Sequence, residues 1–231
     1  MSMTEKQHIC LESNKNLIQK KLIFDTFGNA SLLVQKNLLI KPSGVDLNAI
    51  TQEDISVVDL TSGTHLSGKK PSSDTPTHLE IYRKFPDIGG IVHTHSLYAT
   101  AWAQAGKPIP CLGTTHADYW KGVIPVTRPL TEEEITRDYE AETGKVIVET
   151  INQLDVEILH CPGILVPHHG PFTWGATIDE AVSNAQRLEY IAQMAWITLQ
   201  ISPTIKSIPS TLHQKHFLRK RGSNAYYGQE T

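Results

Sequence analysis

The sequence predicts an α/β layered domain. Short apolar runs of strand length are mixed along the chain with longer segments whose apolar residues recur at helical spacing. Of the 231 residues, 39% are apolar and 19% are charged, which is enough apolar material for a sizeable core and too little charge for a disordered chain. No linker-like stretch divides the chain, so we expect one domain over residues 1–231.

The first half of the chain carries patterns for two helices and four strands. Apolar residues at near-helical spacing predict an amphipathic first helix, and two β-type runs around Lys36-Asn37 predict a hairpin. Pro76 suits the first turn of a helix. The predicted elements are a helix ending near Lys21, strands Ser31–Gln35, Leu38–Lys41 and Ile55–Leu60, a helix from Thr75-Pro76 to about Lys84, and a strand Ile88–Thr94.

The second half is richer in helices. Ser96 fits an N-cap and Gly106 a helix terminator, and the apolar residues after Thr177 form one long helical face. The predicted elements are helices Leu97–Ala105 and Ile135–Leu154, strands Glu157–His160 and Ile164–Pro167, a long helix beginning at Thr177 or Asp179, and a short helix over about Leu212–Lys220.

Charge, cysteine content and hydropathy exclude several classes of protein. Lys and Arg number 21 against 24 Asp and Glu, a formal net charge of −3, and this balance argues against a nucleic-acid or anionic-membrane binder. The three cysteines lack C-x-x-C spacing, so we expect neither a disulfide framework nor a cysteine-rich zinc site, and a reducing, cytoplasmic compartment fits them. No segment has the roughly 18 unbroken apolar residues of a membrane span, and no signal-peptide pattern opens the chain.

Two histidine clusters follow apolar strands. In Ile91-Val92-His93-Thr94-His95, residues 93 and 95 point to the same side of a strand, close enough for two imidazoles to chelate one metal ion. Taken alone, such a pair is more often two polar residues at a strand end. A second cluster, His168-His169, follows the strand at residues 164–167. Together the clusters predict a three-histidine metal site with a position left open for substrate.

Three loops could hold an anion. The segment Ser72-Ser73-Asp74 leads into a helix, where hydroxyls and free N–H groups suit a phosphate, although ordinary helix capping explains the same residues. The loops Phe27-Gly28-Asn29 and Lys41-Pro42-Ser43-Gly44 contain glycine and serine, which allow close backbone approach to a phosphate, although each loop alone is more often an ordinary turn. Asp118 could act as a general acid or base, or be a turn residue. Tyr226-Tyr227 near the end could be held by packing or at a site.

With these pieces in order, the chain resembles the class II aldolase and adducin family, and within it the epimerase branch. The resemblance runs through nearly the whole chain. The stretches that carry it are GNAS (28–31), IKPSGVDL (40–47), KKPSSDTPTH (69–78), FPDIGGIVHTHS (85–96), GTTHADYW (113–120), ETGKVIVETI (142–151), HGPFTWG (169–175), and KHFLRK and AYYGQ near the end.

The resemblance implies a central, mostly antiparallel sheet flanked by helices, and epimerisation of L-ribulose 5-phosphate to D-xylulose 5-phosphate at C4. It implies one divalent metal ion per subunit, usually Zn²⁺, and a homotetramer whose active sites lie between subunits, with the C-terminal tyrosine supplied by the neighbouring chain. The implied site residues are Asp74, His93, His95 and His169 for metal, Gly28, Asn29, Ser43, Gly44, Ser72 and Ser73 for the sugar phosphate, and Asp118 and Tyr227 for proton transfer.

Two other functions remain open within this resemblance. One is a sugar-phosphate aldolase of the L-fuculose-phosphate type, which releases both fragments and usually carries Glu at the position of Asp74. The other is a non-catalytic, adducin-like binding module. The intact histidines argue against this second interpretation, because a binding module has no use for a metal-ligand set.

Overall fold

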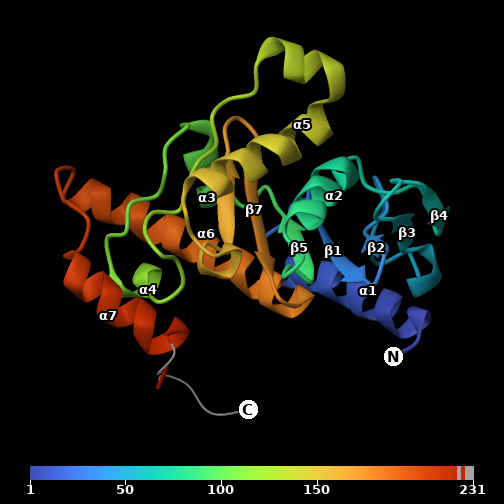
Figure 1. Cartoon of the computed structure of the whole chain (residues 1–231), viewed down its shortest axis with the longest axis horizontal. Coiled ribbons are helices and arrows are strands. Elements are labelled where there is room, and N and C mark those ends of the chain that lie inside the picture. Colours follow the sequence, from blue (N-terminus) through green and yellow to red (C-terminus); the bar gives the residue numbers. More distant parts are fainter. Residues whose placement is uncertain (223–224, 227–231) are drawn as a thin grey trace.

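A seven-stranded sheet with helices on both faces forms the centre of the computed structural model, which describes residues 1–222 and 225–226 (Figure 1). The strand order is β4-β3-β2-β1-β5-β7-β6, and each neighbouring pair is antiparallel. The elements are α1 (Met3–Gln19), β1 (Asn29–Val34), β2 (Asn37–Ile40), η1 (Gln52–Asp54), β3 (Ser56–Asp59), β4 (His65–Ser67), α2 (Thr75–Lys84), β5 (Gly90–His93), α3 (Leu97–Gln104), α4 (Thr114–Ala117), α5 (Glu132–Gln153), η2 (Ile158–His160), β6 (Gly163–Val166), β7 (Gly170–Gly175), α6 (Ile178–Ile201) and α7 (Ser210–Arg221).

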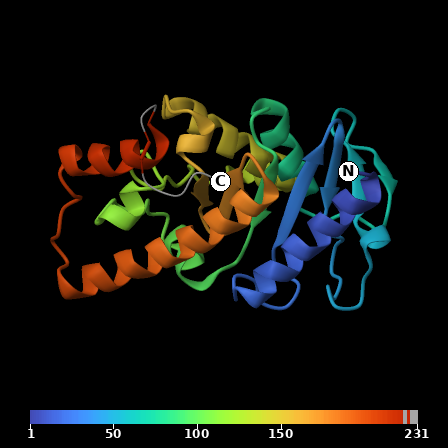
Figure 2. The same cartoon turned by 90° about the horizontal axis from the view of Figure 1, so that it is seen from below.

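The two faces of the sheet bury separate sets of side chains. Adjacent residues of a strand point to opposite faces, so Leu38 packs with α2 and α5 while Leu39 packs with α1 and α6. Figure 2, seen from below, shows α1 and α6 lying along the same face, in front of the strands. The result is the layered architecture that the mixed helix and strand patterns predict, with the antiparallel sheet that the family resemblance implies.

Three chain segments meet where the ends of the inner strands β1, β5 and β7 lie side by side, because neighbouring strands run in opposite directions. We call this place the sheet edge. β5 ends at His93, and its neighbours β1 and β7 both begin beside that residue. Asn29 pairs with His93 in the β1–β5 ladder, and Phe172 pairs with it in the β5–β7 ladder. Antiparallel order therefore places the first residues of two strands and the last residue of a third at the same point.

Most predicted elements are present, but two predictions need correction and several elements were not predicted. The segment predicted as strand Glu157–His160 is the 3-10 turn η2, since the His160 N–H bonds back to the carbonyl of Glu157. The hairpin turn lies at Gln35-Lys36, because Asn37 already pairs with Val34. The strand β7, the short edge strand β4 and the single-turn helix α4 were not predicted. Among the described residues, no helix is long and apolar enough to cross a membrane.

Candidate active site

Three histidines converge at the sheet edge. His93, His95 and His169 each offer a ligand atom within 4.8 Å of the others. The Nδ1–H of His93 donates to the carbonyl oxygen of Pro171 at 3.0 Å, so its Nε2 carries the lone pair. That Nε2 lies 3.1 Å from Nε2 of His95. Two ring nitrogens this close need a proton or a metal ion between them.

Burial keeps these imidazoles neutral. Desolvation lowers the pKa of His93 to about 4 and that of His169 to about 3, and the neighbouring imidazoles add to the effect. The pKa of His95 is lowered as well, again mainly by burial. Neutral imidazole is the form that binds metal, so the cluster is ready to bind a divalent ion near neutral pH.

The chemistry of the donor set fits a catalytic zinc-type site, because three imidazoles leave at least one coordination position open. Asp74, at the N-cap of α2, has its Oδ2 4.0 Å from Nε2 of His93 and accepts a hydrogen bond from Nδ2 of Asn29 at 2.7 Å. Burial opposes ionisation of Asp74, but nearby imidazoles and the Asn29 amide outweigh it and lower its pKa. Asp74 lies beside the three-histidine cluster and not within it, so its role as a metal ligand stays a prediction.

A polar cavity of about 360 Å³ opens on this cluster. It brings together most of the site residues that the sequence predicts, from five separate segments of the chain. Its described lining includes Gly28, Asn29, Ser43, Gly44, Ser72, Ser73, Asp74, His95 and His169, while His93 is buried behind them.

The glycine–serine loops reach the cavity for different reasons. Gly28 has φ +103°, and a Cβ there would lie 2.9 Å from the carbonyl oxygen of His93, so only glycine lets this loop pass the histidine cluster. The hydroxyl of Ser72 is buried and accepts hydrogen bonds from the Asn29 side chain at 3.1 Å and from the N–H of Asp74 at 3.3 Å. Ser73 is exposed to the cavity. The two adjacent serines thus differ, because Ser72 supports the loop and Ser73 lines the cavity.

Lys41 was not named as a site residue, although its loop, Lys41-Pro42-Ser43-Gly44, is one of the three predicted anion loops. It is the one lysine or arginine among the described residues that line the cavity. Its Nζ donates to the carbonyl oxygen of Thr26 at 3.0 Å. Burial lowers the pKa of Lys41, and Asp74 and Asp25 partly offset that effect. A basic residue two positions before Ser43 was the signal that sequence reasoning did not use.

Tyr139 and Glu140 also line the cavity and were not predicted. The hydroxyl of Tyr139 lies 3.3 Å from Nδ1 of His169. Both residues belong to α5, whose sequence pattern shows only an amphipathic helix. No local pattern could have identified them, because their approach to His169 depends on how α5 packs.

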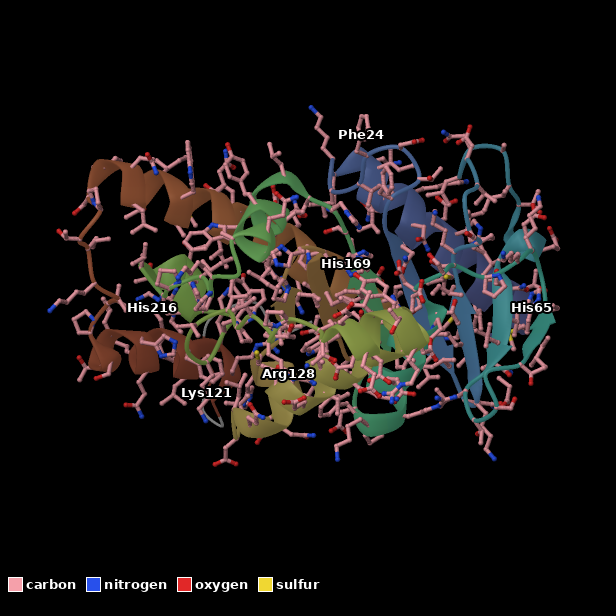
Figure 3. The ribbon with its side chains drawn as sticks, turned by 90° about the horizontal axis from the view of Figure 1, so that it is seen from above. Phe24, His65, Lys121, Arg128, His169 and His216 are labelled. Atoms are coloured by element: carbon pink, nitrogen blue, oxygen red, sulfur yellow. The ribbon has the colours of Figure 1, made fainter. Side chains whose placement is uncertain are left out.

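Asp118 is not part of this cavity. Its carboxylate accepts two hydrogen bonds from Arg219, at 3.0 and 2.8 Å, and one from Nδ1 of His216 at 3.0 Å. Burial opposes its ionisation, but these donors outweigh burial and lower the pKa of Asp118. Figure 3 shows His216, and so this cluster, well apart from His169. Tyr227 lies outside the described residues.

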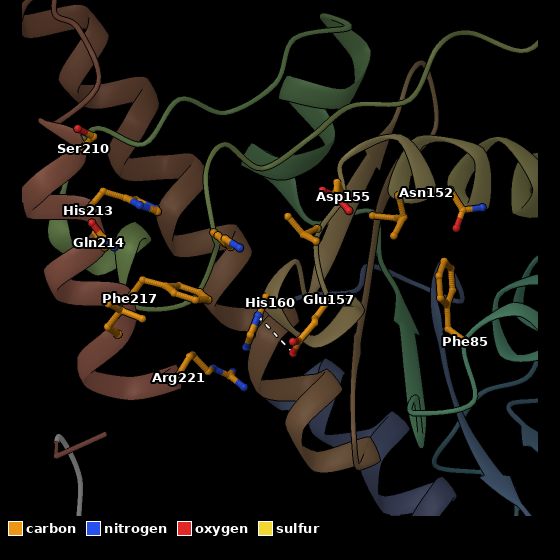
Figure 4. A pocket seen from close by; sticks show the side chains of 14 residues that line it. Phe85, Asn152, Asp155, Glu157, His160, Ser210, His213, Gln214, Phe217 and Arg221 are labelled. Carbon is orange, nitrogen blue, oxygen red and sulfur yellow. Dashed lines mark ion pairs between the residues drawn. The ribbon is translucent and has the colours of Figure 1, made fainter. Parts of the chain in front are cut away.

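A more voluminous cavity, of about 860 Å³, lies between α7 and the end of α5 (Figure 4). It is lined by Phe217 and Arg221 on one side and by Asp155, Glu157 and His160 on the other, with the last two forming an ion pair at 3.5 Å. Among the described residues, no three potential metal ligands converge there. The smaller cavity beside the histidines is therefore the candidate active site.

Comparisons with known proteins identify the family and the fold. A family model described as the class II aldolase and adducin N-terminal domain matches residues 9–196. An L-fuculose 1-phosphate aldolase structure superposes with a TM-score of 0.78 at 23% identity, covering 94% of this chain and 96% of that one. A Klebsiella pneumoniae protein, for which aldolase, epimerase and decarboxylase are given as candidate activities, has a TM-score of 0.73 at 26% identity, covering 93% and 99%. The L-fuculose-1-phosphate aldolase of Thermus thermophilus gives 0.68 at 22%, covering 88% and 100%.

Proposed function

Since the chain belongs to the class II aldolase and adducin family, we propose that it is an L-ribulose-5-phosphate 4-epimerase, which interconverts L-ribulose 5-phosphate and D-xylulose 5-phosphate. The observation that carries the proposal is a three-histidine cluster opening on a polar cavity that is bordered by glycine–serine loops and one lysine. The epimerase-type stretches around Ser72 and Asp118 favour this reaction over other reactions of the family.

The substrate's own chemistry requires a carbon–carbon cleavage. The proton on C4 is not adjacent to the C2 ketone, so its removal would give a carbanion without resonance stabilisation. Breaking the C3–C4 bond instead leaves an enediolate and glycolaldehyde phosphate. Rotation of the aldehyde and re-addition to its other face invert C4. A divalent ion such as Zn²⁺, held by His93, His95 and His169 with Asp74 nearby, would supply Lewis-acid stabilisation of the negative charge.

The loops around the cavity have the groups needed to keep the phosphate anchored while the aldehyde rotates. The Lys41 ammonium supplies positive charge, and the exposed hydroxyls of Ser43 and Ser73 can donate hydrogen bonds. Ser72 and Asn29 hold the loop that carries Ser73. An anchored fragment cannot diffuse away between cleavage and re-addition, which is what separates an epimerase from an aldolase.

Proton transfer needs two carriers, because the C4 oxygen points in opposite directions in the two epimers. We assign these roles to Asp118 and Tyr227. Arg219 lowers the pKa of Asp118 and keeps it ionised, the form in which a carboxylate can accept a proton. Its position away from its own chain's cavity supports an active site completed by a neighbouring subunit of a homotetramer.

A sugar-phosphate aldolase is the second candidate, favoured by the similarity to L-fuculose 1-phosphate aldolase structures. It would cleave the same kind of bond but release both fragments. Asp74, where such aldolases usually carry glutamate, favours the epimerase.

A coupled assay separates the two. Metal-loaded protein is incubated with L-ribulose 5-phosphate, and D-xylulose 5-phosphate and free glycolaldehyde phosphate are both quantified, with and without chelator. We expect chelator-sensitive formation of D-xylulose 5-phosphate and little free aldehyde. Stoichiometric release of aldehyde without epimer would establish the aldolase instead, and no turnover of any tested ketose phosphate would reject both.

A further inference from the structure

The helix α5 is broken beside the active site. Asp138 has φ −159° and ψ 73°, which are not helical, although the helix continues on both sides of it. Figure 1 shows the first turns of α5 directed away from the sheet and the remainder lying over it. Arg137, just before the break, pairs with Glu142 after it and Glu133 before it. These ion pairs therefore connect the two parts of α5 across the break.

Tyr139 is the first residue after this break. Its hydroxyl lies 3.3 Å from Nδ1 of His169, and the two ring centroids are 5.9 Å apart. The Thr143 hydroxyl donates to the backbone carbonyl of Tyr139 at 2.8 Å and ties it to the helix that follows. The phenol is half-buried, with one side facing the cavity.

The contact matters because it affects which nitrogen of His169 carries the hydrogen and which is free to bind a metal ion. An imidazole binds metal through a nitrogen lone pair, so the other nitrogen must carry the hydrogen and needs an acceptor. For His93 that acceptor is the backbone carbonyl of Pro171, which directs Nε2 into the cluster. For His169 the group beside Nδ1 is the Tyr139 hydroxyl, which leaves Nε2 for the metal.

We propose that Tyr139 is a positioning residue that holds His169 in the metal-binding tautomer and orientation, through an Nδ1–H···Oη hydrogen bond. The proposal rests on the metal site of the proposed function, but not on its substrate or reaction. The backbone acceptor of His93 cannot be removed by mutation, whereas the acceptor of His169 can. The broken helix gives a structural reason for the contact, since the break at Asp138 lets the next residue reach the sheet edge.

The test is the metal affinity of Tyr139→Phe, which deletes one oxygen and keeps the ring. Metal-free wild type and variant are titrated with Co²⁺, followed by its visible absorption, and then with Zn²⁺ against a competing chelator. We expect affinity to fall about 10- to 100-fold, with a shifted Co²⁺ spectrum and unchanged thermal unfolding of the metal-free protein. Tyr190→Phe, on the exposed face of α6, is the matched control and should bind as wild type does.

Tyr139→Ala distinguishes the hydroxyl from the ring. If the phenylalanine variant keeps wild-type affinity and spectrum, the proposal is overturned, and loss only in the alanine variant would assign the contact to ring packing. The readout is independent of turnover. Weakened binding in Tyr139→Phe would support the inference even if the protein failed the epimerase assay.

Discussion

Single side chains decide whether the site holds a metal ion. His95 is partly exposed and faces His93 across 3.1 Å, whereas His93 is fully buried and stacks on Phe172. We expect His93→Asn and His95→Asn each to lose most bound zinc and most activity, because either change leaves only two imidazoles. Elemental analysis of purified protein measures the loss. His168→Asn is the matched control, since that exposed neighbour of His169 lies outside the cluster. Full zinc occupancy in both cluster variants would disprove the metal assignment.

The adjacent serines give a second residue-level prediction. Ser73→Ala should raise KM for the sugar phosphate roughly tenfold, because a hydroxyl facing the cavity is lost, while metal content stays unchanged. Ser72→Ala removes the acceptor for the Asn29 side chain and should also lower stability, by about 1 kcal/mol. The double variant should bind substrate still more weakly. Steady-state kinetics and thermal unfolding separate the effects. An unchanged KM together with reduced stability would mean that these serines only cap the helix.

At the scale of elements, Asp74 is the N-cap of α2, and α2 is held in place by its packing against α5. Gly144 of α5 lies against α2, where an added Cβ would be 2.6 Å from Cβ of Glu80 and 2.9 Å from the carbonyl oxygen of Thr77. Gly144→Ala should therefore lower the free energy of unfolding by about 1–3 kcal/mol through overpacking, although alanine is the better helix former. Gly113→Ala, where no atom lies within 4 Å, is the control in urea unfolding. Equal stability of the two variants would show that α2 and α5 can move apart to fit the added methyl group with little loss of free energy of unfolding.

At the scale of the whole molecule, one chain does not bring together all of the proposed catalytic residues. Asp118 is bound by Arg219 on α7, apart from the histidine cluster. We expect inactive His95→Asn chains mixed with inactive Asp118→Asn chains to recover part of the activity after subunit exchange. A mixed interface can pair an intact metal site with an intact aspartate. Tyr227→Phe should behave as Asp118→Asn does, with metal retained and activity reduced by roughly 10²–10⁴-fold.

The subunit-exchange experiment has a control and a result that would contradict the proposal. Two variants that both change the metal cluster, His95→Asn and His93→Asn, should not complement each other, and they control for contamination. If Asp118→Asn and His95→Asn chains form mixed oligomers without recovered activity, then Asp118 lies outside the active site. Native mass spectrometry of the mixture establishes that the hybrids formed.

Buried histidines should make the stability of the metal-free protein depend on pH. Burial lowers the pKa of His78, which bonds to Ser31, and that of His116 to about 4 in the folded chain, against an ordinary 6.5. Between these values the unfolded chain takes up protons and the folded chain does not. Stability is thus complete above about pH 6.5 and falls as pH drops toward 4, by on the order of 3 kcal/mol per histidine.

Urea unfolding at pH 7.5, 6 and 5 measures this loss. His78→Gln should show a shallower fall than wild type between pH 6 and 5, because one of the buried titrating groups is gone. His65→Gln, at an exposed position, should leave the slope unchanged. An identical slope in all three proteins would show that the buried imidazole of His78 does not govern acid stability.

Local patterns in the sequence determined much of this molecule. The helical periodicity after Thr177, the Pro-started helix at Thr75 and the buried-type strand ending near His93 are each confirmed, because spacing along the chain and burial of one face are local properties. The two histidine clusters were equally visible. Their chemistry needs only the side chains and a strand before each cluster.

The tertiary structure decided what those segments do together. Antiparallel order places Asn29, His93 and His169 at one sheet edge, and no local pattern records which strands become neighbours. Lys41 and Tyr139 join the site through packing, and Asp118 is separated from it for the same reason. The strand β7 went unpredicted because its residues are buried on both sides and show no alternation. Contacts between residues far apart in sequence depend on the whole fold, so a linear pattern can name the groups but cannot place them.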